Sequence, residues 1–345
     1  MPIKHTHIGG QAVLEGVMMR GKKNWAVAVR EPNGSIHLEA HELKTAVTDH
    51  PWLGKPIIRG VWGMYETLVL AMKAFGISAE HAGETEDEQL TSKEIAFTMV
   101  AGVALAVGLF IVLPAVLTNL AVGEATEKPF TWNVVDGGLR VVAFFAYIWA
   151  ISRMKDIQRV FSYHGAEHKT IHAYENGLPL EVEPIQTFKT LHVRCGTSFL
   201  LMVMIIAIIV FSIVPVKPIV AAIGVDGKIF TLFVAIALRI VLMPLIAGLA
   251  YEVIKWAGGR SESPAVKVLL WPGLQLQRMT TREPEDDMIE IAVASMKAVI
   301  ASEEGREVDI REILGLPAES ADDALESDDA TTVSDSDAKD SGEIA

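Results

Sequence analysis

The chain has almost no cysteine. Cys195 is the only one in 345 residues, so no disulfide can form within the chain. The N-terminus, MPIKHTHIGG, lacks the apolar stretch and the small-residue cleavage site of a signal peptide. The sequence also lacks an internal repeat and a basic, aromatic-interleaved patch, so we expect no nucleic-acid partner. These absences exclude a disulfide-stapled domain and argue against a nucleic-acid-binding protein.

Negative charge is scarce outside one segment, although the whole chain carries a net charge of −13. Residues 302–345 contain 15 acidic and 3 basic side chains, so the preceding 301 residues carry about −1. This segment has few large apolar residues to bury. We therefore expect a disordered acidic tail over residues 302–345.

Long uncharged runs are abundant. Half of the residues are apolar and 21% are charged, which is typical of a membrane protein with sizeable polar parts. A helix of about 20 apolar residues crosses a hydrocarbon core of about 30 Å. The sequence predicts an α-helical integral membrane protein with about four spans: Ile95–Val122, Val134–Ser152, Gly196–Val216 and Ile229–Tyr251. The second contains Asp136 and Arg140, and it is included because the charge distribution of the loops requires it.

The distribution of Lys and Arg predicts the orientation of these spans. Residues 153–194 hold six basic side chains, and residues 252–282 hold five more. The connections 123–133 and 217–228 hold one and two. Because basic loops stay on the cytoplasmic side, four spans place both rich segments and both termini in the cytoplasm.

The polar parts divide into segments around the membrane domain. Residues 1–55 predict a small β-hairpin module around Pro32-Asn33-Gly34. Residues 56–94 predict an amphipathic helix lying in the membrane interface, followed by an acidic linker. The membrane domain covers residues 95–258, with a cytoplasmic histidine-rich loop at 153–195. Residues 259–301 predict a cytoplasmic helical segment before the tail.

The densest polar constellation is YHGAEHKTIHAYE, residues 163–175. On a helix, His164, His168 and His172 recur at i, i+4 and i+8 and share one stripe. Two imidazoles one turn apart can bind a single zinc ion. The letters from His164 to His168 spell HxxEH, in which Glu167 would be the general base for a metal-bound water.

Further donors lie close in sequence or on the same predicted membrane face. His192 and Cys195 enter the third span, and Glu252 ends the fourth. We expect a divalent metal, zinc above others, with ligands drawn from His164, His168, His172, His192, Cys195 and Glu252. His5, His7 and Glu15 could also contribute. The alternative is a solvated juxtamembrane helix whose histidines face water, or a closed and purely structural metal site.

Arg239 is the one charged residue in the fourth predicted span. A charge at this depth is costly and needs a partner, for which Asp136, Asp226 or a neighbouring subunit could serve. The simplest interpretation is an ion pair that holds the spans together.

Several long motifs resemble the YqhQ-like family of bacterial membrane proteins of unknown function. They are GGQAVLEGVMMRG, FSYHGAEHKTIHAYE, HVRCGTSFL, GLAYE and PGLQLQRMTTREP, spread over residues 5–285. The resemblance implies a multi-span protein of the bacterial inner membrane and a metal-dependent enzyme. It supplies no substrate and no catalytic residue.

Two function classes follow from these observations. The leading hypothesis is a metal-binding membrane protein, a hydrolase that acts on a membrane-associated peptide or lipid. The alternative is a non-catalytic scaffold or biogenesis factor that docks a cytoplasmic protein partner or a second copy of itself in the lipid bilayer. A transporter is weaker, because the spans show no repeated pair of broken helices.

Overall fold

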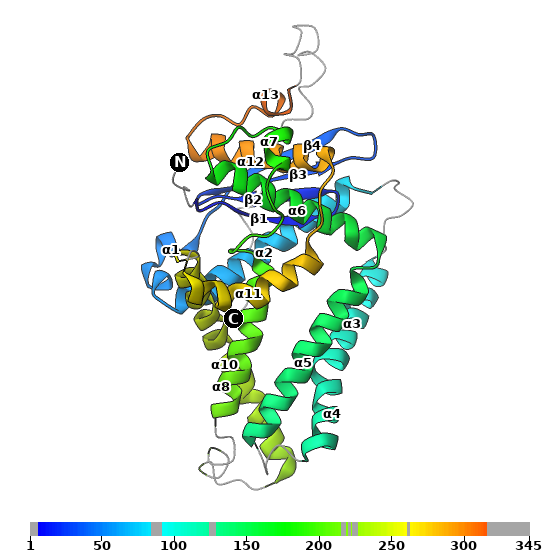
Figure 1. Ribbon diagram of the computed structural model, residues 1–345, viewed down its shortest axis with the longest axis vertical. Coiled ribbons are helices and arrows are strands. Elements are labelled where there is room, and N and C mark those ends of the chain that lie inside the picture. Colours follow the sequence, from blue (N-terminus) through cyan, green and yellow to red (C-terminus); the bar gives the residue numbers. More distant parts are fainter. Residues whose placement is uncertain are drawn as a thin grey trace, which may run out of the picture.

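The computed structural model describes residues 6–83, 92–123, 129–214, 219, 222, 227–260 and 263–315. It has a polar part built on a sheet and an elongated helical part below it (Figure 1). Three features of the sequence lie outside the described residues: Asp226, a candidate partner of Arg239; Lys128, the basic residue of the connection 123–133; and residues 316–345 of the acidic tail. The elements of the polar part are β1 (Gly9–Val13), β2 (Gly16–Arg20), β3 (Asn24–Arg30), β4 (Ile36–Glu42), α1 (Ala46–Asp49), η1 (Pro51–Gly54), α2 (Ile58–His81), α6 (Lys155–Glu175), α7 (Val182–Gln186), α11 (Pro264–Thr280), α12 (Asp286–Glu303) and α13 (Ile310–Leu314).

Within the described residues, four helices are long and apolar enough to span a membrane, which confirms the expected fold class. They are Val100–Val122, Phe130–Ile151, Gly196–Ile213 and Ile236–Gly258. They belong to α3 (Ser92–Val107), the π-helical turn η3 (Gly108–Val112), α4 (Leu113–Val122), α5 (Pro129–Ile151), α8 (Gly196–Ile213) and α10 (Lys228–Gly258). Their large apolar side chains are mostly exposed, as lipid-facing helices require.

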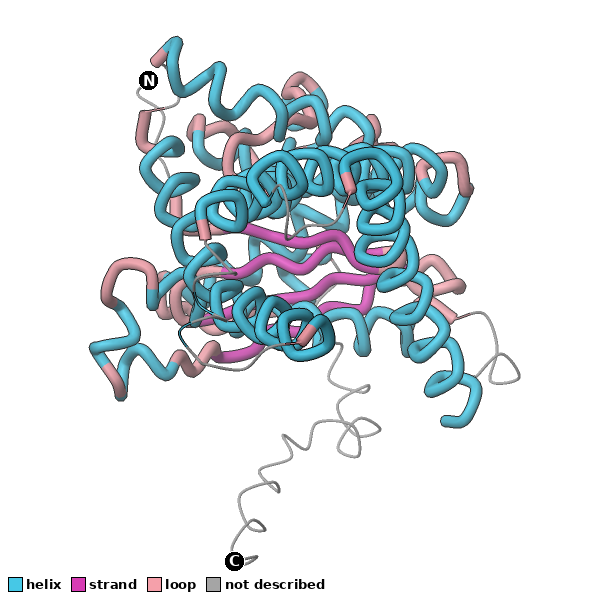
Figure 2. The backbone as a smooth tube through the Cα atoms, turned by 90° about the horizontal axis from the view of Figure 1, so that it is seen from below, coloured by secondary structure: helices cyan, strands magenta, loops and turns pink. Residues whose placement is uncertain are grey.

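The sheet is antiparallel, with the strands in the order β1-β2-β3-β4 (Figure 2). The expected hairpin is present as β3 and β4, and the glycine-rich segment before it adds a second hairpin. Side chains alternate along each strand and pack against helices on opposite faces of the sheet. Val17, Met19, Ala26 and Ala28 pack against α6 and α12, whereas Met18, Trp25 and Val27 pack against Leu70 and Ala74 of α2.

One core therefore joins segments that are far apart in the sequence. Tyr163 and Ala166 of α6 meet Ile289, Ala292 and Met296 of α12 over one face of the sheet. The segment boundaries expected from the sequence stay a prediction. The structure adds that this core contains residues of the N-terminal module, the histidine-rich loop and the C-terminal helical segment.

The acidic tail begins later than Ser302. Helix α12 runs to Glu303, and α13 follows after a short connection. Val308, Ile313 and Leu314 pack against the core that α12 shares with the sheet. These three apolar side chains supply an anchor among the charges of residues 302–315, and disorder of the rest of the tail stays a prediction.

Polar side chains inside the spans pair with one another. Arg140 bonds Asp136 at 2.9 Å, one helical turn away on α5. Arg239 donates to Asn133 Oδ1 at 3.3 Å and lies 5.6 Å from the centres of the Trp132 and Phe211 rings. The charge of Arg239 is thus held between α5 and α8, which agrees with a structural role.

Candidate metal centre

Helix α6 carries the histidine stripe as the spacing predicted. It ends at Glu175, where Asn176 caps it and Gly177 takes a positive φ of 69°. The stripe faces a loop and two helix ends: residues 187–195 between α7 and α8, the start of α8, and the end of α11. His168 is buried, and so are His192 and Cys195.

Backbone carbonyls fix the orientation of the first two imidazoles. The Nδ1–H group of His164 donates to the carbonyl oxygen of Thr280 at 2.8 Å. The Nδ1–H group of His168 donates to the carbonyl of Thr190 at 2.5 Å. A carbonyl only accepts, so the neutral form of each ring carries its proton on Nδ1 and has its lone pair on Nε2. This is the arrangement that metal-binding histidines adopt.

The sulfur of Cys195 lies where these lone pairs can share an ion with it. His164 Nε2 is 3.2 Å from Cys195 Sγ, and donor atoms of His164, His168 and Cys195 all lie within 4.8 Å of one another. Two ligands of one tetrahedral zinc ion are about 3.5 Å apart, given bond lengths of about 2.1 Å to nitrogen and 2.3 Å to sulfur. The three residues therefore fit zinc and leave a fourth position open.

Cys195 is also placed to carry negative charge. It is the N-cap residue of α8, and the N-terminus of a helix favours an anion. The hydroxyl of Thr197 lies 3.1 Å from Sγ. A thiolate is the form of cysteine that binds metal, so the helix end supports the same role as the two imidazoles.

His172 and His192 join Glu175 in a second group, whose donor atoms also lie within 4.8 Å. His172 Nε2–H donates to the carbonyl of Leu191 at 2.9 Å. Glu175 already binds the guanidinium of Arg194 and accepts from the backbone N–H of Thr6 at 3.1 Å. We infer that this group is a polar wall beside the centre, because the guanidinium of Arg194 already neutralises its carboxylate.

The electrostatics of this wall are set by burial and by Arg194. Burial opposes ionisation of Glu175, but the nearby His192, the N–H of Thr6 and the charge of Arg194 outweigh it and lower its pKa to about 2. Burial lowers the pKa of His192 to about 4 and also lowers the pKa of His172. Both imidazoles are therefore neutral near pH 7, with Glu175 charged.

Gln277 of α11 holds the loop and the start of α8 in place. Its amide oxygen accepts from the backbone N–H of His192 at 2.8 Å. Its amide nitrogen donates to the carbonyl of His192 at 2.8 Å and to Ser198 Oγ at 2.7 Å. Sequence reasoning missed Gln277, Thr280 and Thr190. The two threonines act through backbone carbonyls, which leave no residue signature.

Glu167 is buried on the side of α6 that faces strand β1. A Cβ atom on Gly10 would come within 2.7 Å of its Cγ, so the close contact needs glycine there. Burial raises the pKa of Glu167 to about 7, against the opposing influence of His164 and the N–H of Gly10. Such a carboxyl can hold or release a proton near neutral pH.

Glu252 is not brought to the histidine stripe. Its carboxylate binds the guanidinium of Arg59 through Nε at 2.8 Å and Nη2 at 2.5 Å, and it accepts from the N–H of Ile57 at 3.2 Å. Glu252 was expected on the same membrane face as the histidine stripe, but its partner Arg59 belongs to α2 and not to α6. Glu15 likewise pairs with Arg159. His7 is exposed, and His5 lies outside the described residues.

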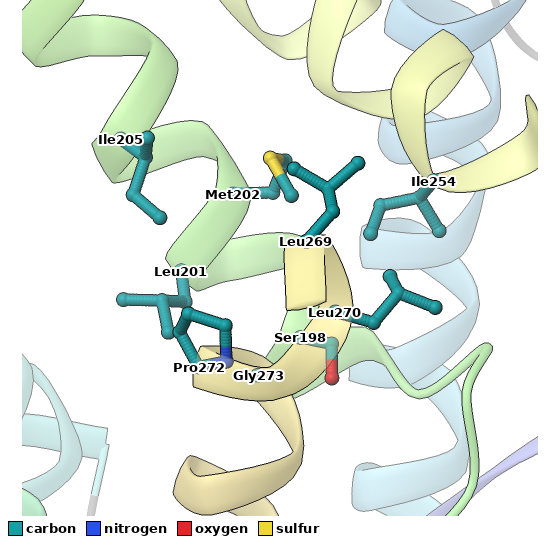
Figure 3. Close-up of a pocket in the computed structure, with 9 residues that line it drawn as sticks. All are labelled: Ser198, Leu201, Met202, Ile205, Ile254, Leu269, Leu270, Pro272 and Gly273. Carbon is teal, nitrogen blue, oxygen red and sulfur yellow. The ribbon is translucent and has the colours of Figure 1, made fainter. Parts of the chain in front are cut away.

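An apolar cavity lies beside the centre, between α8, α10 and α11 (Figure 3). Ser198 lines it and is one turn from Cys195. Helix α11 approaches α8 closely here, because a Cβ atom on Gly273 would lie 2.6 Å from Ser198 Oγ. The volume of the cavity is about 10 Å³. That space holds about one water molecule, so an acyl chain or peptide would need α8 and α11 to separate.

Comparisons with known proteins agree with the family resemblance. The model of the family described as "Protein of unknown function (DUF1385)" matches residues 55–302. The chain is 32% identical over 311 residues to "Uncharacterized protein YqhQ" of Bacillus subtilis (strain 168), covering 86% of this chain and 92% of that protein. No solved structure matches.

Proposed function

The chain belongs to the DUF1385 family, and from its geometry we propose that it is a zinc-dependent hydrolase of the bacterial inner membrane. The ion would be held by His164, His168 and Cys195. One observation carries the proposal: two imidazoles, each oriented by a backbone carbonyl, have ring nitrogens within 4.8 Å of a buried sulfur at a helix N-terminus.

The open fourth position supports catalysis. Zinc with three protein ligands keeps room for a water molecule, lowers the pKa of that water to about 7, and polarises a carbonyl or phosphoryl oxygen. Glu167 follows His164 by three residues and precedes His168 by one. Its buried carboxyl would accept the proton of that water. The substrate would be a peptide or lipid bond at the membrane surface, because Cys195 stands at the end of span α8.

A second candidate function is favoured by the tight packing around the centre. Glu167 lies against Gly10, and the neighbouring cavity has a volume of only about 10 Å³. A metal ion in such a closed place would tie α6 to α8 and α11. The protein would then be a scaffold whose polar part docks a cytoplasmic partner.

The orientation of the protein is part of the proposal, with both termini in the cytoplasm. Lys169 is buried, so Leu178, which is exposed just after α6, is the better reporter. We expect Leu178→Cys to react with an impermeant thiol reagent only after permeabilisation, and Lys128→Cys to react in intact cells. Wild type, with buried Cys195, gives the background. Labelling of both from the same side would remove α5 as a span.

Metal occupancy tests the ligand set. Elemental analysis after chelator-free purification should find about one zinc per chain in wild type and almost none in His164→Ala, His168→Ala or Cys195→Ala. His172→Ala is the matched control, because the structure places His172 in the second group, and it should keep the ion. Equal loss in all four variants would contradict the assignment of ligands.

Glu167→Gln separates the hydrolase from the scaffold. The variant should keep zinc, because Glu167 is not a ligand. Membranes from cells that express wild type should accumulate a cleaved lipid or peptide, measured by mass spectrometry. Membranes with Glu167→Gln or His168→Ala should lack that product. Identical membranes in all three strains, with zinc bound to wild type, would favour the scaffold.

A further inference from the structure

A second cluster of histidines lies on the sheet, apart from the candidate metal centre. His37, Glu39 and His41 alternate along β4, which is at one edge of the sheet, and therefore share one face. This is the face that α2 covers, and His81 is the last residue of α2. Glu31 follows β3 directly. The sheet and α2 thus bring three imidazoles and two carboxylates together.

The side chains of this cluster are in direct contact. The rings of His37 and His81 stack with centroids 3.5 Å apart and planes at 12°. Glu31 Oε1 is 3.1 Å from His81 Nδ1. Glu39 bridges its two neighbours on the strand, at 2.8 Å from Nε2 of His37 and 2.8 Å from Nε2 of His41.

The carboxylates determine which ring nitrogens stay free. An ionised carboxylate only accepts, so His37 carries a proton on Nε2 and His81 carries one on Nδ1. The lone pairs of the neutral rings then remain on Nδ1 of His37 and Nε2 of His81. Histidines that bind metals usually donate their other N–H to a carboxylate in this way.

We propose that Glu31, His37 and His81 form a second site, for a divalent transition-metal ion taken up from solvent. Each residue offers one donor atom, and these atoms lie within 4.8 Å of one another. Imidazole with carboxylate suits zinc, nickel and copper. The side chains are 26–27% exposed, so an ion can reach them and water can complete its coordination. One of the stacked rings turns to point its lone pair at the ion.

The ion would add a link between α2 and the sheet, which already meet through side-chain packing and the ion pair of Arg20 with Glu66. His81 ends α2, whereas His37 belongs to the strand at the edge of the sheet. Binding would fix the end of α2 to this edge and so raise the thermal stability of the folded state. The site is therefore distinct from the centre on α6 in both position and consequence.

Nickel titration of the tag-free, full-length His164→Ala/His168→Ala protein in detergent tests this site. This background lacks the ligands of the first centre, so failure of the proposed hydrolase does not affect the result. Calorimetry should show one Ni²⁺ per chain. Adding His81→Ala or His37→Ala should weaken binding at least tenfold. Adding His50→Ala, at an exposed histidine outside the cluster, should leave it unchanged.

Glu31→Gln keeps the shape of the side chain, so weaker binding in this variant would not come from a folding defect. It should also weaken Ni²⁺ binding at least tenfold, with the metal-free melting temperature close to that of the background. Absence of uptake in the background protein would overturn the proposal. Equal affinity with and without His37 and His81 would overturn it as well.

Discussion

Replacing Arg194 by Met should lower the free energy of unfolding by about 3 kcal/mol, because it leaves a buried carboxylate without its cation. Glu175 is only 5% exposed in its side chain, and Arg194 is its charged partner. Arg194 Nη1 also donates to the carbonyl of Thr6 at 2.5 Å, which ties down the start of the chain. Urea denaturation in detergent, followed by tryptophan fluorescence, measures the change.

Arg306→Met is the matched control. Arg306 pairs with Glu304, but both side chains are more than half exposed, so the same substitution should cost less than about 1 kcal/mol. Equal effects of the two substitutions would show that the Glu175 pair is not part of the stabilising core.

The same pair gives a pH dependence with a defined sign. Glu175 has a pKa of about 2 in the folded protein, below its ordinary value of 4.5. Its carboxylate therefore contributes stability above about pH 4.5, and this contribution is lost as the pH falls towards 2. Glu175→Gln should show a smaller loss of stability over this range than wild type.

Gly165→Ala should destabilise the protein by about 3 kcal/mol through overpacking. A Cβ atom at this position would lie 2.0 Å from the carbonyl oxygen of Arg282. That backbone cannot move freely, because the N–H of Arg282 donates to the carbonyl of Phe161 at 2.9 Å. Displacing it would also move Thr280, which orients His164. We therefore expect weaker zinc binding together with the loss of stability.

Gly76→Ala is the control for the backbone effect of alanine in a helix. Gly76 lies within α2, is exposed, and has no atom within 4 Å of the added Cβ. Alanine there should be neutral or stabilise the protein by up to about 1 kcal/mol. If Gly165→Ala were as stable as Gly76→Ala, the close approach of residues 280–282 to α6 would be wrong.

The sequence predicted those features that depend on short-range periodicity. Two uncharged runs and one broken only by Arg239 predicted three spans, the charge of the loops required the fourth, and spacing by four residues put three histidines on one stripe of α6. The first hairpin was missed because Gly9, Gly10 and Gly16 are poor strand residues. Two of them are needed by packing: a Cβ atom would come within 2.7 Å of Glu167 at Gly10 and within 2.5 Å of Ala28 at Gly16. Only the folded structure contains that information.

The ligand set was harder to predict than the stripe that carries it. Topology places Glu252 and the histidines on one membrane face, but it does not fix their lateral positions. Arg59, from a helix expected to lie apart in the interface, is the partner of Glu252. Cys195 lies 3.2 Å from His164, because the chain returns to α6 where the loop enters α8; its role as a ligand stays a prediction. The carbonyls that orient the two rings could not be predicted from residue type.

The cobalt-substituted protein tests the central claim most directly. Co²⁺ bound by two imidazoles, one thiolate and water should give visible bands typical of a tetrahedral site, and a sulfur-to-cobalt charge-transfer band in the near ultraviolet. We expect both in wild type at about one Co²⁺ per chain, with loss of the charge-transfer band in Cys195→Ser. A wild-type spectrum identical to that of Co²⁺ in buffer would contradict a metal centre at His164, His168 and Cys195.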